Sequence, residues 1–197
     1  MSDHRWRRGF EEITSNVKVD ATDIDDDNEE PERCSCRSHS NEACCYDERC
    51  FNFATQTECV SRCHAGCKNQ RFRKRQYANI EVRESPGKGY GLFTNMDLRA
   101  GQFIYEYLGE LISLKELHRR MQENVTERHL YAMQLNTKTF LDSRKKGSIG
   151  RFINHSCEPN CIIEIWNSEG CLKAGIFATK VISSNTELSF DYQVLTN

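Results

Sequence analysis

One stretch decides the fold of this chain: Gly150-Arg151-Phe152-Ile153-Asn154-His155-Ser156-Cys157-Glu158-Pro159-Asn160-Cys161. It sets amide, imidazole, hydroxyl and thiol side chains among apolar residues. Burying such groups is unfavourable unless each one is hydrogen-bonded. The stretch therefore predicts a site in which partners or a ligand satisfy them. The alternative interpretation is a tight turn, since Asn160 follows Pro159.

A second segment, Glu187-Leu188-Ser189-Phe190-Asp191-Tyr192, favours the site over the turn. The two segments together resemble the paired signature of the SET-domain protein lysine methyltransferases. The resemblance implies a mainly β fold with small α content, the β-clip fold with a C-terminal pseudoknot, in which the segments thread through each other. Their junction would then form the sites for S-adenosylmethionine and for the lysine. A small zinc-bound module is expected to precede this domain.

Length and composition limit what else the chain holds. Its 197 residues suffice for one catalytic domain and a small accessory module. The net charge of -2 gives no global attraction to nucleic acid, so binding to DNA would depend on local patches. No apolar run approaches the about 20 residues of a membrane span, and the polar N-terminus is unlike a signal peptide. We expect a soluble protein without membrane partners, and the family implies the nucleus and chromatin.

Residues 1–32 change from basic, at Arg5, Arg7 and Arg8, to strongly acidic between Asp20 and Glu32. This composition predicts a disordered acidic tail. The simpler interpretation is a solvated linker. The alternative is an acidic strip that competes with nucleic acid for a basic face.

Residues 33–76 contain eight closely spaced cysteines and few large apolar side chains. A segment of this kind cannot fold on apolar burial alone, whereas a structural zinc ion contributes on the order of ten kcal/mol in small peptides. The C-x-C opening and the later spacings resemble the AWS (associated-with-SET) module. In that module seven thiolates bind two zinc ions and share one ligand.

The resemblance assigns seven ligands: Cys34, Cys36, Cys44, Cys50, Cys59, Cys63 and Cys67. The six-residue step to Cys50 matches one branch of the family if Cys44 is the bridging ligand, which leaves Cys45 as the spare. His39 and His64 are further conceivable ligands, although the thiols alone are sufficient.

A basic run follows the cysteines. Residues 68–75 include Lys68, Arg71, Arg73, Lys74 and Arg75 with no acidic residue among them. Such a run can neutralise phosphates, and the family places it facing nucleosomal DNA. A solvated surface is the alternative.

Residues 77–193 are expected to form the SET domain. Short strands are predicted from Asn79 to Arg83, within 101–112, at 130–135 and at 139–142, and a hairpin at 162–178 around Asn167-Ser168-Glu169-Gly170. The one convincing helix is predicted from Ser113 to Arg128. Ser113 and Glu116 form a capping box there, and Leu114, Leu117, Met121 and Val125 recur at helical spacing.

The resemblance also assigns a cofactor site. Its K-G-x-G turn corresponds to Lys88, Gly89, Tyr90 and Gly91, where glycine lets the backbone approach S-adenosylmethionine. Tyr131, Arg151, Asn154 and His155 match the other cofactor positions. This turn lacks the ending of a phosphate-binding P-loop.

The catalytic tyrosines by the same match are Tyr107, Tyr131 and Tyr192, and the substrate channel comprises Tyr107, Met133, Phe190 and Tyr192. Methyl transfer needs a neutral lysine amine. Neutrality at pH 7 costs about 4.6 kcal/mol for a free lysine, and a dry aromatic channel lowers this cost. Tyr192 could act as a base or as an orienting hydroxyl. Its high pKa favours orientation.

The closest branch of the family carries the AWS module and methylates lysine 36 of histone 3, which implies a histone tail within a nucleosome as the substrate. Its members usually continue into a post-SET segment, whose three cysteines bind a third zinc with the cysteine matching Cys157. No such cysteines follow Tyr192 in this sequence, so we expect residues 1–197 to bind cofactor weakly and turn over slowly. The alternatives are a non-catalytic chromatin-binding module and a methyltransferase for a non-histone lysine.

Overall fold

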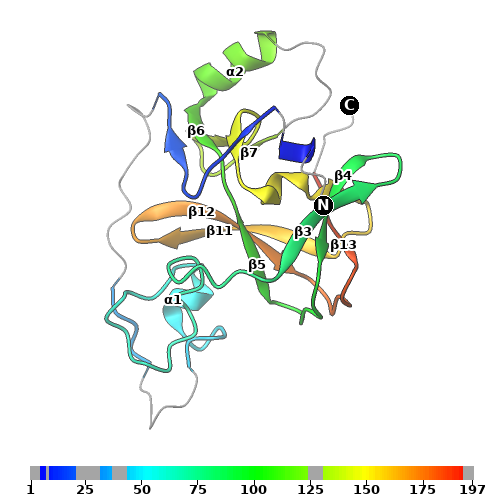
Figure 1. Ribbon diagram of the computed structural model, residues 1–197. Helices are drawn as coiled ribbons and strands as arrows, with labels where there is room; N and C mark the ends of the chain where they lie inside the picture. Colours follow the sequence, from blue (N-terminus) through cyan, green and yellow to red (C-terminus); the bar gives the residue numbers. More distant parts are fainter. Residues whose placement is uncertain (1–4, 8, 21–31, 37–43, 124–130, 193–197) are drawn as a thin grey trace.

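The computed structural model describes residues 5–7, 9–20, 32–36, 44–123 and 131–192 (Figure 1). Residues 1–4, 8 and 21–31 of the predicted acidic tail, His39, the end of the predicted helix after Glu123 and the residues after Tyr192 lie outside these ranges. None of the described helices combines the length and the apolarity that crossing a membrane requires.

Short strands dominate the described part of the chain. They are β1 (Glu11–Glu12), β2 (Val17–Lys18), β3 (Ile80–Ser85), β4 (Gly89–Thr94), β5 (Phe103–Tyr107), β6 (Glu110–Ser113), β7 (Ala132–Gln134), β8 (Thr139–Asp142), β9 (Lys146–Gly147), β10 (Asn154–His155), β11 (Cys161–Ser168), β12 (Cys171–Ala178) and β13 (Glu187–Phe190). The helices are α1 (Phe51–Ala54) and α2 (Leu114–Glu123), with 3-10 turns η1 (Arg5–Arg7) and η3 (Ile149–Phe152).

These strands form four small sheets, ordered β1-β9, β10-β13-β4-β3, β11-β12-β5 and β2-β6-β8-β7. The main core lies between them and includes the fully buried Leu92, Ile104, Leu141, Ile176 and Leu188. The predicted mainly β architecture is therefore observed, with apolar residues of the short strands meeting in one interior.

The predicted hairpin is confirmed as β11 and β12. Ser168 pairs with Cys171, so Glu169 and Gly170 alone make the turn. Both have positive φ, 58° and 75°, the left-handed geometry whose twist suits a two-residue hairpin. The hairpin extends the sheet to β5, whose residues Phe103, Ile104, Glu106 and Tyr107 are buried.

Helix α2 begins where the capping box predicted, but it packs differently. The Ser113 hydroxyl accepts the Glu116 N–H at 3.2 Å. The apolar stripe is largely outside the core, since Leu114 is 47% and Met121 45% exposed. Arg120 is the buried residue of this helix, so α2 is attached through a charged side chain.

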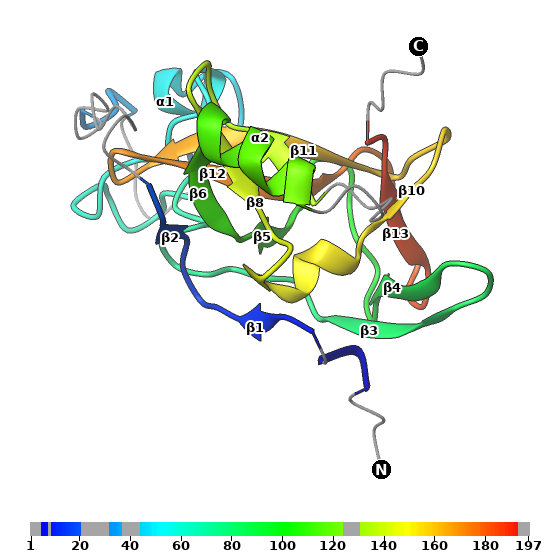
Figure 2. The same ribbon diagram turned by 90° about the horizontal axis from the view of Figure 1, so that it is seen from above.

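The prediction of a disordered tail is wrong for residues 9–20, which we call the N-terminal segment. It runs along the domain with β1 parallel to β9 and β2 parallel to β6 (Figure 2). Strands of two residues in an acidic context carry no detectable sequence period. β1 and β2 form because their backbones pair with hydrogen-bonding groups of β9 and β6 that would otherwise be unpaired.

The cysteine-rich module docks on the end of the β11–β12 hairpin. Phe72, Phe103, Trp166 and Phe177 form a buried aromatic cluster at this junction. Next to it the fully buried Glu58 carboxylate accepts three hydrogen bonds, from the backbone N–H groups of residues 72 and 73 and from a serine hydroxyl of β11. A buried carboxylate satisfied on both oxygens can hold the module, the linker and the sheet together.

Candidate active site

The two motif segments pair directly with each other. β10 runs parallel to β13, with Asn154 opposite Ser189 and His155 opposite Phe190. The Asn160 side chain also joins the segments, because its amide donates to the Glu187 carbonyl at 2.8 Å and accepts the Ser189 N–H at 2.9 Å. Asn160 thus serves long-range pairing, and the interpretation of the stretch as only a tight turn does not hold.

Glu187 organises the side of the site next to the β3–β4 turn, and the sequence did not single it out. Its carboxylate accepts from the Asn154 amide at 2.7 Å and from the Ser85 hydroxyl at 3.0 Å. The Asn154 amide also donates to the Tyr90 carbonyl at 3.1 Å. Any side chain at Gly91 would collide with this arrangement, since its Cβ would lie 2.5 Å from a Glu187 oxygen. In the sequence, the only indication of a role for Glu187 was that it begins the second motif.

His155 lies at the crossing of the two segments. Its Nδ1 accepts the Tyr192 N–H at 3.2 Å, so the proton of the neutral ring is on Nε2, 3.5 Å from the Cys157 sulfur. The Lys88 ammonium donates to the His155 carbonyl at 3.4 Å. The structure therefore brings the K-G-x-G turn, Asn154 and His155 together, as the cofactor assignment requires.

The tyrosine hydroxyls are held by backbone carbonyls. Tyr192 donates to the Ile153 carbonyl at 2.7 Å, and Tyr107 to the Tyr131 carbonyl at 3.4 Å. Burial raises the pKa of Tyr192 to about 12 and also raises that of Tyr107. Both hydroxyls therefore remain protonated at neutral pH and act as oriented donors.

Arg151 supports Tyr131. Its guanidinium carbon lies 4.2 Å from the Tyr131 ring centre and 4.5 Å from that of Phe10. Its nitrogens donate to the carbonyls of Ser143 at 2.9 Å and Arg144 at 3.3 Å. Arg151 thus links the loop before the first motif to an aromatic residue of the site.

A groove of about 500 Å³ lies beside β13 and contains three of the four predicted channel residues, Met133, Phe190 and Tyr192. Strands β7 and β11 supply its other walls, among them Ile163. Tyr107 is not in its lining; it is buried, and its hydroxyl donates to the Tyr131 carbonyl. The Phe190 and Tyr192 rings are 4.7 Å apart, so the groove ends against an aromatic wall.

The thiols of the cysteine-rich module converge into two four-membered groups. One contains Cys34, Cys45, Cys59 and Cys63, and the other contains Cys34, Cys36, Cys45 and Cys50. The sulfurs of Cys34 and Cys45 are 3.5 Å apart, and those of Cys34 and Cys63 are 3.7 Å apart. Zinc–thiolate bonds of about 2.3 Å in a tetrahedron place sulfurs about 3.8 Å apart. The residues therefore fit zinc.

The structure places the predicted spare, Cys45, among the converging thiols, and Cys44 beside it: their sulfurs are 3.2 Å apart, and both form a third group with His64. Cys45 belongs to both four-thiol groups, while Cys44 contacts the Nε2 of His64 at the edge. Cys45 is buried and adopts a left-handed backbone with a φ of 57°. Cys67 is buried in the same cluster without belonging to either four-thiol group of the described residues.

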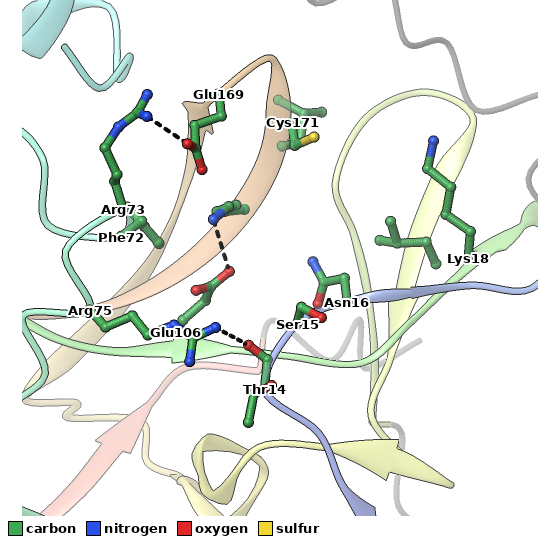
Figure 3. A pocket seen from close by; sticks show the side chains of 13 residues that line it. Thr14, Ser15, Asn16, Lys18, Phe72, Arg73, Arg75, Glu106, Glu169 and Cys171 are labelled. Atoms are coloured by element: carbon green, nitrogen blue, oxygen red, sulfur yellow. Dashed lines mark hydrogen bonds and ion pairs between the residues drawn. The ribbon is translucent and has the colours of Figure 1, made fainter. Parts of the chain in front are cut away.

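The basic run does not form one DNA-facing strip. The Arg71 guanidinium lies over the rings of Trp166 and Phe177, at 4.6 Å and 5.0 Å, and burial lowers its pKa. Arg73 pairs with Glu169 at 2.6 Å (Figure 3). Apolar and acidic partners of the hairpin hold these two arginines, so the basic run is not one uninterrupted exposed strip.

The remaining cations of the run are still available to solvent. Lys68, Lys74 and Arg75 are exposed, and Arg75 also donates to the Thr14 carbonyl at 3.3 Å (Figure 3). Any contact with phosphate from this run therefore rests on three positive charges instead of five.

Comparisons with known proteins agree with this geometry. The SET domain matches residues 89–193. The Emericella nidulans protein named "Histone-lysine N-methyltransferase, H3 lysine-36 specific" is 47% identical over 161 residues, 80% of this chain and 16% of that protein. The protein of the same name from Candida albicans is 45% identical, over 78% of this chain and 19% of its own length. The chain thus spans less than a fifth of these two relatives.

Solved structures are similar as well. The crystal structure of the Chaetomium thermophilum polycomb repressive complex 2 superposes with a TM-score of 0.73 at 26% identity, covering 81% of this chain and 24% of that one. The structure of the same complex in an autoinhibited conformation, bound to S-adenosylmethionine, gives a TM-score of 0.71 at 26% identity, with the same coverage.

Proposed function

The chain belongs to the SET-domain family, and from this premise we propose that it transfers methyl groups from S-adenosylmethionine to a histone lysine on nucleosomes, with lysine 36 of histone 3 as the target. The family also confirms the predicted fold class. The observation that carries the proposal is the direct β10–β13 pairing, which sets the predicted cofactor residues beside an aromatic groove. The names of the relatives support the choice of lysine.

The predicted cofactor residues fit S-adenosylmethionine. Gly89 has a φ of 80° with nothing within 4 Å of where a side chain would begin, so the turn can approach a ligand closely. Next to it lie the amide of Asn154, the imidazole of His155 and the aromatic ring of Tyr90, groups suited to a polar cation. When bound, the cofactor supplies an electrophilic methyl group on a sulfonium. Lys88, Gly91, Arg151 and Tyr131 would complete this site.

The groove residues prepare the lysine. Met133, Phe190 and Tyr192 would exclude water around its side chain, which disfavours the ammonium and lowers the cost of the neutral amine. The hydroxyl of Tyr192 would orient the amine without taking its proton, because it stays protonated. Tyr107 lies outside the groove lining and would act by holding Tyr131. Positioning of this kind is worth about 7–11 kcal/mol in well-oriented reactions.

We also propose two zinc ions in the cysteine-rich module, one in each four-thiol group, with Cys34 and Cys45 as the shared ligands. The thiol distances support this arrangement. Cys157 is exposed and separate from the module, and it would bind a third ion only together with thiols of an additional segment.

We therefore also propose that the protein acts in the nucleus on chromatin, where its histone substrate would be. Lys68, Lys74 and Arg75 would then contact nucleosomal DNA through phosphate. Replacing Lys68 and Lys74 by Ala is expected to weaken nucleosome binding at low salt and to reduce its salt dependence by about two counterions.

The test of the proposed reaction is labelled methyl transfer from S-adenosylmethionine to recombinant nucleosomes, compared with free histones and with a cell extract depleted of histones. Label on nucleosomal histone is the expected result. Label only in the extract supports the non-histone alternative. Cofactor binding without any transfer supports the non-catalytic module, and an Asn154→Ala chain serves as the matched control for binding.

A further inference from the structure

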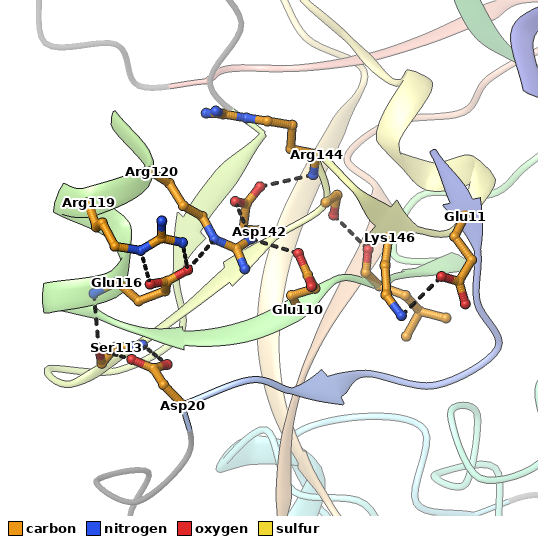
Figure 4. A network of polar contacts seen from close by, with 12 residues as sticks. Glu11, Asp20, Glu110, Ser113, Glu116, Arg119, Arg120, Asp142, Arg144 and Lys146 are labelled. Carbon is orange, nitrogen blue, oxygen red and sulfur yellow. Dashed lines mark hydrogen bonds and ion pairs between the residues drawn. The ribbon is translucent and has the colours of Figure 1, made fainter. Parts of the chain in front are cut away.

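The N-terminal segment is anchored along its whole length. Glu11 donates its N–H to the Lys145 carbonyl at 2.7 Å, and its carboxylate pairs with Lys146 at 3.0 Å (Figure 4). Farther along, Val17 donates its N–H to the Gly109 carbonyl at 3.1 Å. At its end, an Asp20 oxygen accepts the Ser113 N–H at 2.9 Å, where α2 begins (Figure 4). The segment is therefore a fixed part of the catalytic domain.

This anchoring places one aromatic side chain against the site. β9 is the partner of β1 and leads within a few residues into η3 and β10, which carry Arg151, Asn154 and His155. Phe10 directly precedes β1, and its ring lies 4.5 Å from the guanidinium carbon of Arg151. The Phe10 and Phe152 rings are 5.7 Å apart in an edge-on arrangement.

Arg151 in turn holds Tyr131. Its guanidinium lies 4.2 Å from the Tyr131 ring, and its hydrogen bonds to the Ser143 and Arg144 carbonyls fix its position on one edge. A cation stacked on aromatic rings is stabilised by their negative faces, most strongly when it is partly desolvated, and the Phe152 ring lies against the same guanidinium at 5.2 Å. Loss of the Phe10 ring would expose the guanidinium to water and weaken its hold on Tyr131.

We infer that Phe10 is a positioning residue for the cofactor site, acting through Arg151 on Tyr131. The inference rests on the proposed function, since Tyr131 and Arg151 are the residues assigned there to S-adenosylmethionine. Phe10 itself touches neither cofactor nor lysine in this scheme. The N-terminal segment, whose sequence predicts a solvated tail, would then support the cofactor site.

The experiment measures the affinity of the whole chain for S-adenosylmethionine by calorimetry, together with kcat and KM on nucleosomes. Phe10→Ala is expected to weaken cofactor affinity about tenfold, with the KM for nucleosomes unchanged. Phe10→Tyr keeps the aromatic face and should retain the parent affinity. Phe10→Leu fills the space without a π face and should resemble Phe10→Ala.

The matched control is Glu12→Ala, an exposed change in the same segment, which should leave cofactor affinity unchanged. Thermal unfolding of every variant separates affinity from folding. If Phe10→Leu binds S-adenosylmethionine as tightly as the parent chain does, the ring only fills space and the inference is overturned. The inference is also overturned if Phe10→Ala binds the cofactor as tightly as the parent chain. A parent chain that binds cofactor but transfers no methyl group refutes the proposed function, while the affinity order still decides the role of Phe10.

Discussion

The hydroxyl of Tyr192 donates to the Ile153 carbonyl at 2.7 Å, and burial raises the pKa of this residue to about 12. Its contribution to stability is fully present below about pH 10, the pKa of an unfolded tyrosine, and is lost as the pH rises toward the folded value. Over the range in which the enzyme can be assayed, Tyr192 is thus a neutral donor. The rise of activity with pH should follow the substrate lysine, whose own pKa is about 10.4.

Replacing this hydroxyl tests its role. Tyr192→Phe is expected to lower kcat about tenfold or more through loss of one orienting hydrogen bond. The shape of the pH–rate profile below pH 10 should remain the same. The measurement is kcat against pH for both proteins, and disappearance of an ionisation step in the variant would show that Tyr192 is a base after all.

Under the proposed function, Phe190 would set how much room the lysine amine has. Its ring lines the groove 4.7 Å from the Tyr192 ring, and a tyrosine hydroxyl there would occupy space or hold a water beside the amine. Phe190→Tyr should therefore shift the product toward monomethyl-lysine. Mass spectrometry of the modified histone measures this shift, and an unchanged distribution of methyl states contradicts it.

Helix α2 is attached to its sheet by charge. Arg120 is buried and pairs with Glu110 at 2.6 Å, Asp142 at 2.9 Å and Glu116 at 2.8 Å (Figure 4). Hydrogen bonds from Arg119, and to a smaller extent from Arg120, lower the pKa of Glu116 to about 2. Removing the buried cation would leave two buried carboxylates, on β6 and β8, without their cation.

Arg120→Met should therefore destabilise the protein by about 3–5 kcal/mol. The neighbouring Arg119 is half exposed and pairs only with Glu116 and Glu123 on the same helix. Arg119→Ala should cost less than about 1 kcal/mol. Urea unfolding measures the free energy of unfolding of both variants. Equal losses would show that the buried ion pairs of Arg120 stabilise the protein no more than the exposed pairs of Arg119.

Sequence patterns predicted those elements that carry their own periodicity or turn chemistry. The β11–β12 hairpin and the start of α2 were predictable from Gly170 and Ser113. The face on which α2 packs was not predictable. An analysis of periodicity selects the face with Leu114 and Met121, because one arginine contributes too little to change that result. β1 and β2 form only because β9 and β6 offer unpaired backbone groups, which is tertiary information.

At the scale of the whole molecule, the motifs could be predicted but their supporting contacts could not. The paired signature predicted that the two motif segments meet, as β10 and β13 do, whereas the contacts of Glu187 and Phe10 join residues far apart in the sequence. Cys44 and Cys45 are adjacent in the sequence and their sulfurs lie 3.2 Å apart, so spacing alone cannot distinguish their roles as ligands. Arg71 was predicted to face DNA because burial against Trp166 leaves no mark in a charge pattern.

The shared cysteines should decide whether the cysteine-rich module folds. Cys45→Ser is expected to remove a ligand from both four-thiol groups, to lower zinc content from about two ions per chain to below one, and to unfold the module. Cys44→Ser should retain both ions. Metal analysis of the purified chains provides the measurement, with thermal unfolding as the second readout, and loss of zinc from Cys44→Ser alone would restore the spacing-based assignment.

The most direct measurement of the proposed function is the location of the methyl label. Recombinant nucleosomes carrying single lysine-to-arginine changes in histone 3 are incubated with the chain and labelled S-adenosylmethionine, and the modified lysine is identified by mass spectrometry. The prediction is transfer to every nucleosome except the one with arginine at position 36, and transfer about tenfold or more slower with Tyr192→Phe. Full labelling of the arginine-36 nucleosome, or no transfer by a chain that binds both zinc and cofactor, would contradict it.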